Sequence, residues 1–240
     1  SQRPSPANTR KTRRQDSKPA SCVAPSRCDG RRLASMGVYH HCVFPYLLDL
    51  AMGSRVFDKP RRRTLARASG RILEIGFGTG RNLPHYPPGV SRIEAIDPDT
   101  DLDRFSLPRI ATSSIAVDFH HLNAEHLPFE GNSFDTVVCT LTLCSIPDVV
   151  HALGEIHRVL KPGGQFLFLE HGLSPDARVA RWQHRLNPIQ NRIGGGCHLV
   201  RETLPVVAGS GLQLRDAEHY YLRRIPRFAG YMTEGSALKV

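Results

Sequence analysis

The segment LEIGFGTG, residues 73–80, is an apolar run that passes directly into three alternate glycines. Glycine permits sharp backbone turns and lets a ligand approach the main chain closely. The GxGxG spacing, with Glu74 two residues before Gly76, differs from the GxGxxG pattern of dinucleotide-binding sites. Prolines between residues 84 and 88 limit the following element to about one helical turn, too short to hold a pyrophosphate. The segment therefore predicts a strand that ends in a ligand-binding turn.

From this turn onward, short apolar runs alternate with helical patterns. Such alternation, with strands that are apolar on both faces, predicts a mostly parallel sheet covered by helices. The last two strand-like runs are too close together for a crossover helix, so we expect them to pair antiparallel. The predicted fold class is α/β, with a doubly wound, mostly parallel seven-stranded sheet and a C-terminal antiparallel hairpin. The predicted strands are 71–75, 92–96, 115–120, 134–140, 165–170, 212–221 and 229–237.

Helices are predicted from apolar residues at helical spacing. In the segment 147–160, Val149, Leu153 and Ile156 share one face, and Ser145 is the candidate N-cap. The run KPGG at residues 161–164 is expected to end this helix. The other predicted helices are 44–52, 59–68, 176–192 and 202–208.

Most of the positive charge lies at the start of the chain. The 240 residues carry a formal net charge of +10, and residues 1–35 account for +7 of it. This segment is rich in Pro, Ser and Arg and has little apolar surface to bury, so we expect a disordered, solvated tail. A transit peptide is the alternative, but prolines at 4, 6, 19 and 25 disfavour an amphipathic helix. The domain is expected over 36–240, with nucleic-acid contact limited to weak tail electrostatics.

Cysteine spacing and hydropathy bear on location and on metals. No stretch approaches the roughly 20 apolar residues of a membrane span, so none is predicted. The six cysteines form no CxxC pair and no zinc-binding spacing, so the sequence predicts no metal site. Reduced thiols in a cytoplasmic protein are the expectation.

Polar residues follow the second and third predicted strands. Asp97 can accept hydrogen bonds from both hydroxyls of a ribose, or it can simply form a turn before Pro98. After the third strand, Asn123 is followed by Ala124. A polar side chain followed by a free backbone N–H can recognise an adenine edge.

Five segments, in order, resemble the motifs of class I S-adenosylmethionine-dependent methyltransferases: EIGFGTG, Asp97, NAEHLPF, NSFDTVVC and HRVLKPGG. Together they cover about residues 70–170. The resemblance implies a Rossmann-like methyltransferase fold with S-adenosylmethionine as cofactor. It also implies the cofactor-binding residues: Glu74, Gly76, Gly78 and Gly80 at the methionine end, Asp97 on the ribose, and Asn123 with Ala124 on the adenine. Many relatives have Asp where Asn123 stands, and an amide oxygen still accepts a hydrogen bond.

A second set of segments is similar to the thiol methyltransferase-like family of animals and to related bacterial small-molecule methyltransferases. These segments are HYPPGVSRIEAIDP, VVCTLTLCSI, FLFLEHG and GGGCHLVRET, within about residues 70–210. The resemblance implies a small-molecule acceptor and makes a thiol the first candidate. Amine-, quinone- and lipid-directed methylation are the alternatives. The apolar N-terminal anchor of the animal members has no counterpart in this sequence, so membrane residence is not carried over.

Catalysis demands little of the side chains, because the sulfonium already makes the methyl group electrophilic. Alignment supplies much of the rate, and a base is needed only for a protonated acceptor. His171 and Glu170, at the end of the fifth predicted strand, are the candidate catalytic residues. His171 could equally hold a loop by hydrogen bonding. Two other functions are kept open: a non-catalytic binding protein, and a nicotinamide-dependent oxidoreductase, which the terminal hairpin disfavours.

Overall fold

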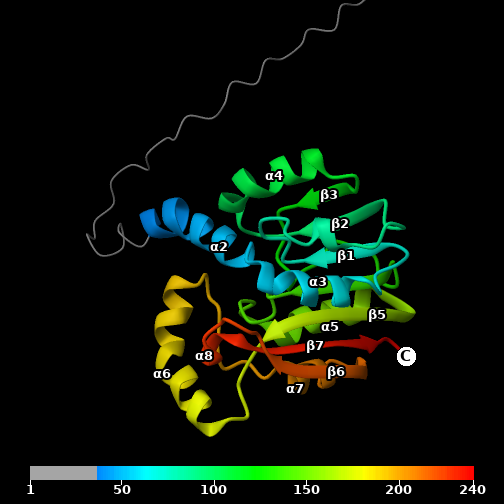
Figure 1. Ribbon diagram of the computed structural model, residues 1–240. Coiled ribbons are helices and arrows are strands. Elements are labelled where there is room, and N and C mark those ends of the chain that lie inside the picture. Colours follow the sequence, from blue (N-terminus) through cyan, green and yellow to red (C-terminus); the bar gives the residue numbers. More distant parts are fainter. Residues whose placement is uncertain (1–36) are drawn as a thin grey trace, which may run out of the picture.

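The computed structural model describes residues 37–240, which form a seven-stranded sheet flanked by helices (Figure 1). The strand order is β3-β2-β1-β4-β5-β7-β6, in which the first five strands run parallel and β7 pairs antiparallel with both neighbours. The predicted fold class is therefore confirmed, while the predicted tail 1–35 lies outside the described residues. The strands are β1 (Ile72–Ile75), β2 (Arg92–Ile96), β3 (Ala116–His120), β4 (Phe134–Thr140), β5 (Leu160–His171), β6 (Gln213–Tyr221) and β7 (Tyr231–Leu238).

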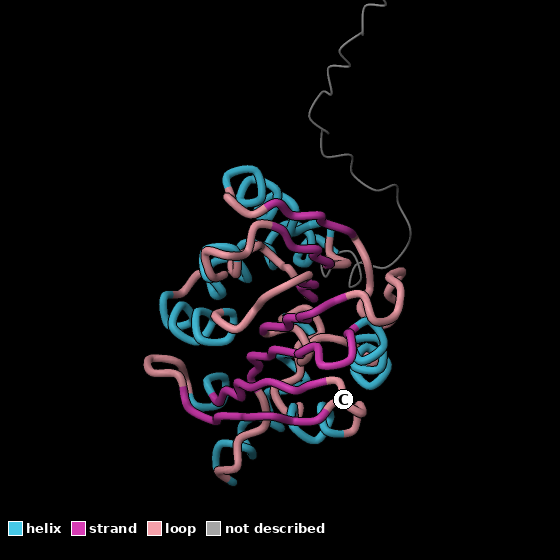
Figure 2. The backbone as a smooth tube through the Cα atoms, turned by 90° about the vertical axis from the view of Figure 1, so that its right-hand side faces the viewer, coloured by secondary structure: helices cyan, strands magenta, loops and turns pink. Residues whose placement is uncertain are grey.

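Alternate residues of the central strands are buried on opposite faces of the sheet. On β4, Val137 and Cys139 pack in the cluster that contains α5 (Val149–Val159) and α7 (Thr203–Ala208). Val138 packs on the other side, with residues of α3 (Asp58–Leu65) and α4 (Asp103–Thr112). Figure 2 shows helices on both sides of the stacked strands. Burial on both faces explains why these strands read as continuous apolar runs.

Two local predictions were wrong. Strand β5 begins at Leu160, before the predicted 165, because Leu160 already pairs with Phe134 ahead of the KPGG turn. The N-cap of α5 is Asp148, whose side chain accepts a hydrogen bond from the His151 N–H at 3.0 Å. Ser145 lies in the preceding loop instead, where its N–H donates to the Thr142 carbonyl. A carboxylate next to the first turn also suits the helix dipole.

Helices α2 (Phe44–Met52) and α6 (Ala177–Ile193) lie at the carboxyl ends of the parallel strands (Figure 1). They meet near their ends. In the π-helical turn Tyr39–Val43, which leads into α2, the Tyr39 hydroxyl donates to the Ile193 carbonyl at 2.8 Å. The Phe44 ring lies so close to Gly195 that a Cβ there would be 2.6 Å from it. Among the helices of residues 37–240, none is both long and apolar enough to cross a bilayer.

Candidate active site

A cavity of about 360 Å³ lies at the carboxyl ends of β1, β2 and β4. It brings together five of the predicted cofactor residues, from three separate parts of the sequence: Gly76, Gly78, Asp97, Asn123 and Ala124. Glu74 and Gly80 are not among the lining residues. The carboxyl edge of a parallel sheet is where ligands bind in this architecture, because loops from neighbouring strands converge there.

The glycine turn is held in a conformation that favours glycine at each of its three positions. Gly76, Gly78 and Gly80 have φ angles of +74°, +55° and +75°. The Gly76 N–H donates to the carbonyl of Ile96 at 2.9 Å, which ties the turn to the end of β2. The turn therefore presents bare backbone to the cavity, and its position is fixed by the neighbouring strand.

Asp97 is buried at the end of β2 and already accepts two backbone hydrogen bonds. One carboxylate oxygen accepts from the Gly78 N–H at 2.7 Å and the other from the Asp99 N–H at 2.9 Å. Burial raises the pKa of Asp97 above its ordinary value, and the bonds from Asp99 and Gly78 counteract this. Each oxygen keeps one lone pair, so the carboxylate can still accept from a diol.

Glu74 lies beneath the glycine turn, in a fully buried polar network. Its carboxylate accepts from the Asn82 amide at 2.9 Å and from the Tyr86 hydroxyl at 2.6 Å. Burial raises the pKa of Glu74 to about 7, although both hydrogen bonds act to lower it. The Asn82 amide also donates to Thr140 at 2.8 Å, at the end of β4. Through the Asn82 amide, Glu74 is thus connected to the end of the neighbouring strand β4.

Arg61 and Asn82 line the cavity and were missed by the sequence analysis. Arg61 is 4% exposed, and burial lowers its pKa to about 10, so it remains a cation at neutral pH. Its Nε, like Asn82 Oδ1, is buried without a hydrogen-bond partner among the described residues. In the run PRRRT, only helical spacing distinguishes this arginine, which lies one turn before the buried Leu65.

The adenine end predicted at Asn123 is formed by a short side-chain network. The Asn123 side-chain amide donates to the Glu125 carboxylate at 2.6 Å, and the side-chain oxygen Oδ1 of Asn123 accepts from the Glu125 N–H at 3.1 Å. The other Glu125 oxygen accepts from the Asp148 N–H at 2.7 Å, which links this loop to the start of α5. Apolar walls complete this end of the cavity: Leu122, Ile146 and Pro147.

Helix α2 covers the cavity with Phe44, Leu48 and Met52. Asp49, on the same helix, accepts from Arg81 at 2.6 Å and from Arg109 at 2.8 Å. Burial acts to raise the Asp49 pKa, but the hydrogen bonds from the two arginines prevail and hold it at about 2. Because Arg81 directly follows the glycine turn, its ion pair with Asp49 holds helix α2 over the glycine turn at the floor of the cavity. The sequence shows no sign of it, since the three charges are far apart in the chain.

Comparison with known proteins relates the sequence of this chain to methyltransferases. A methyltransferase-domain family matches residues 73–168. The thiol S-methyltransferase TMT1B of Rattus norvegicus is 40% identical over 142 residues, 55% of this chain and 55% of the rat protein. The thiol S-methyltransferase TMT1B of Homo sapiens is 37% identical over 180 residues, 67% of this chain and 71% of the human protein. The chain belongs to the S-adenosylmethionine-dependent methyltransferase family of these proteins.

The comparison with solved structures shows the same fold over most of the chain. A crystal structure of an S-adenosylmethionine-dependent methyltransferase from Thermotoga maritima superimposes with a TM-score of 0.60 at 17% identity. It covers 85% of this chain and 99% of that one. At this identity the likeness concerns the fold alone, and it extends well outside the matched domain.

In this methyltransferase, the two candidate catalytic residues lie outside the cavity lining. One Glu170 oxygen accepts from the N–H groups of Thr142 and Leu143, at 2.9 and 3.0 Å, and the side chain is fully buried. Glu170 therefore shapes the loop after β4. His171 turns toward Cys197, with Nε2 3.0 Å from the sulfur. The histidine next to Cys197 in the sequence, His198, contacts Asn191 instead.

Proposed function

We propose that the chain transfers the methyl group of S-adenosylmethionine to the sulfur of a small, mostly apolar thiol. The observation that carries the proposal is the relationship to two thiol S-methyltransferases at more than a third identity, over a chain that retains the glycine turn and Asp97. When bound, the cofactor supplies an electrophilic methyl group on a sulfonium. The protein then needs to hold and align the reactants.

The cofactor contacts are proposed from groups that are left available around the cavity. The spare lone pairs of Asp97 suit the two ribose hydroxyls. At the opposite end, Arg61 Nη1 donates to the Met52 carbonyl at 2.8 Å, but Arg61 Nε and Asn82 Oδ1 are buried without partners among the described residues. They suit the carboxylate and the ammonium of an amino-acid moiety. Asn123 with Ala124 would contact the adenine.

The proposed acceptor side is the loop 141–147, between β4 and α5. Its residues carry no charge, and Leu141, Ile146 and Pro147 line the cavity. Glu170, which could have held a cationic amine, is fully buried outside the cavity lining. Its Oε1 accepts from the backbone of this loop, and its Oε2 is buried without a partner among the described residues. An uncharged, mostly apolar wall favours a soft apolar nucleophile over an amine, and His171 stands behind it as the candidate base or positioning group.

The experiment is an acceptor panel. The full chain is incubated with S-adenosylmethionine carrying a labelled methyl group and, separately, an alkyl thiol, a primary amine, a quinol and phosphatidylethanolamine. Mass spectrometry is expected to find a labelled methyl thioether. Labelled amine or quinol without any thioether would reject the thiol class. Binding of S-adenosylhomocysteine without product from any acceptor would instead favour a non-catalytic protein.

A further inference from the structure

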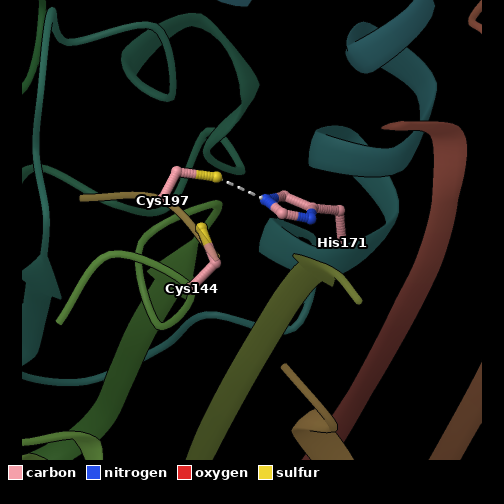
Figure 3. Close-up of side chains that lie close together, drawn as sticks. All are labelled: Cys144, His171 and Cys197. Carbon is pink, nitrogen blue, oxygen red and sulfur yellow. Dashed lines mark hydrogen bonds between the residues drawn. The ribbon is translucent and has the colours of Figure 1, made fainter. Parts of the chain in front are cut away.

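Three potential metal ligands from three separate segments meet at the proposed acceptor loop, which contributes one of them (Figure 3). Cys144 belongs to the loop after β4, His171 is the last residue of β5, and Cys197 follows α6. The two sulfurs and one imidazole nitrogen all lie within 4.8 Å of one another. His171 presents Nε2 to the sulfurs, whereas its Nδ1 is buried without a partner among the described residues.

The ligand set and spacing suit a soft divalent ion. Two thiolates and an imidazole are typical ligands of Zn²⁺, with Zn–S near 2.3 Å and Zn–N near 2.0 Å. Tetrahedral angles at those lengths place the ligand atoms roughly 3.5–3.8 Å apart. The present separations span 3.0 Å, between His171 Nε2 and Cys197 Sγ, to at most 4.8 Å. Rotamer adjustments of less than about 1 Å would therefore complete the site.

The cluster lies directly beside the cavity. Cys144 Sγ is 3.6 Å from the hydroxyl of Ser145, which lines the cavity. The backbone joins the two loops, since the His198 N–H donates to the Cys144 carbonyl at 2.9 Å. Two cysteines and one histidine leave one position of a four-coordinate ion without a protein ligand, which is the ligand count of catalytic rather than structural zinc.

We propose that Cys144, His171 and Cys197 bind one Zn²⁺ ion, and that the acceptor thiol occupies its fourth position. The second half rests on the proposed thiol methylation. Coordination releases the thiol proton to solvent and leaves a metal-bound thiolate. A sulfur lone pair then forms the new S–C bond. The bond between the methyl carbon and the sulfonium sulfur breaks, and its electron pair stays on the sulfonium sulfur. The products are a methyl thioether and S-adenosylhomocysteine.

The test uses the full chain with Co²⁺ as a spectroscopic substitute for Zn²⁺. One equivalent of Co²⁺ is expected to give thiolate-to-metal charge transfer and the intense visible bands of four-coordinate cobalt. An alkyl thiol, added without S-adenosylmethionine, should shift those visible bands. Zn²⁺ should displace the cobalt and remove the colour.

Variants locate the site. Cys144→Ser, Cys197→Ser and His171→Gln should each weaken Zn²⁺ binding by more than the roughly 100-fold that loss of an outer-shell contact costs. The matched control is the triple variant Cys22→Ser, Cys28→Ser and Cys42→Ser, which keeps the three ligands and should retain the spectrum. Circular dichroism and S-adenosylhomocysteine affinity check that each variant is folded.

The outcomes separate this inference from the proposed function. Bands that are lost in the control but kept in the ligand variants would overturn the site. Two titratable thiols lost to a Cys144–Cys197 disulfide, with no metal bound, would overturn it as well. If metal-free protein methylates a thiol at the full rate, the role of zinc in the reaction is disproved and the proposed function stands. If the cobalt bands do not shift when a thiol is added, and the enzyme methylates only amines, thiol coordination and the proposed function are both rejected. The metal site itself would stand.

Discussion

The main chain of Gly76 lies directly against the side chain of Thr142, so that a Cβ built on Gly76 would be 2.1 Å from Thr142 Oγ1. The contact joins the glycine turn after β1 to the loop after β4, the two segments that form the floor of the cavity and its proposed acceptor side. Thr142 Oγ1 also donates to the Gly76 carbonyl at 3.4 Å. At this point neither segment can move independently of the other.

Replacing Gly76 by alanine is expected to be severe. The substitution combines a φ of +74° with direct overlap onto Thr142. The loss should be about 3 kcal/mol or more of the free energy of unfolding, with no measurable S-adenosylhomocysteine binding. The control is Gly154→Ala on α5, where nothing lies within 4 Å of the added Cβ. It should stabilise the protein by about 0.5–1 kcal/mol. Equal effects of the two changes in urea unfolding would contradict the role given to Gly76.

Asp97→Ala should weaken S-adenosylhomocysteine binding, measured by calorimetry, by about 30- to 1,000-fold. Two charge-assisted hydrogen bonds to a ribose contribute roughly 2–4 kcal/mol together. Asp118→Ala is the control, because Asp118 forms a surface ion pair with Arg92 on the neighbouring strands. That change should leave the affinity unaltered. An Asp97 variant within about threefold of the unmodified protein would exclude Asp97 from the ribose site.

Glu74→Gln tests the raised pKa through the pH dependence of stability. Because the pKa of Glu74 is about 7 in the folded protein against 4.5 ordinarily, the folded state binds more protons between these values. Stability from this group is therefore present below pH 4.5 and is lost as pH rises to 7. From pH 4.5 to 8, the variant should gain about 3 kcal/mol relative to the unmodified protein in urea unfolding. A difference for Glu74→Gln that stays constant from pH 4.5 to 8 would disprove the shifted pKa of Glu74.

Asp49→Asn should loosen helix α2 from the floor of the cavity. Losing hydrogen bonds between charged groups is expected to cost about 1–3 kcal/mol of stability at neutral pH. The Asp49 pKa is held at about 2, so this stabilisation is present above pH 4 and disappears as pH falls through 2. The gap between the two proteins should therefore close in acid. A gap of the same size at pH 2 and pH 6 would show that packing, rather than charge, is lost.

The fold could be predicted from sequence because its signals are local. The nearly continuous apolar run of β4 and the helical spacing of Val149 and Ile156 are each contained in about ten residues. The short connection between β6 and β7 also determined their antiparallel pairing. The errors came at the ends of elements, where a distant partner decides. Leu160 joins the sheet only because Phe134 is there to pair with it.

Only part of the site had a local signal. The glycine turn and Asp97 were found because each immediately follows a strand. Arg61 could not be predicted as a site residue, because it lies among neighbouring arginines with the same chemistry. Only the packing of α3 determines which of them is buried at the cavity. The Cys144, His171 and Cys197 cluster has no sequence spacing at all, since the folded sheet alone brings these residues together. A spacing rule for zinc sites applies to ligands on one hairpin or helix, and here there are three elements.

The contact of Phe44 with Gly195 bears on how the protein can be shortened. The methyltransferase-domain match, 73–168, contains the glycine turn, Asp97 and Asn123, but neither α2 nor the end of α6. A fragment trimmed to that match would keep the glycine turn and lose helix α2, which covers the cavity with Leu48 and Met52 and forms the Asp49 ion pairs. The side of the cavity that α2 covers would then be open to solvent. The shortest catalytically useful piece therefore has to begin before the first strand and extend well past the fifth.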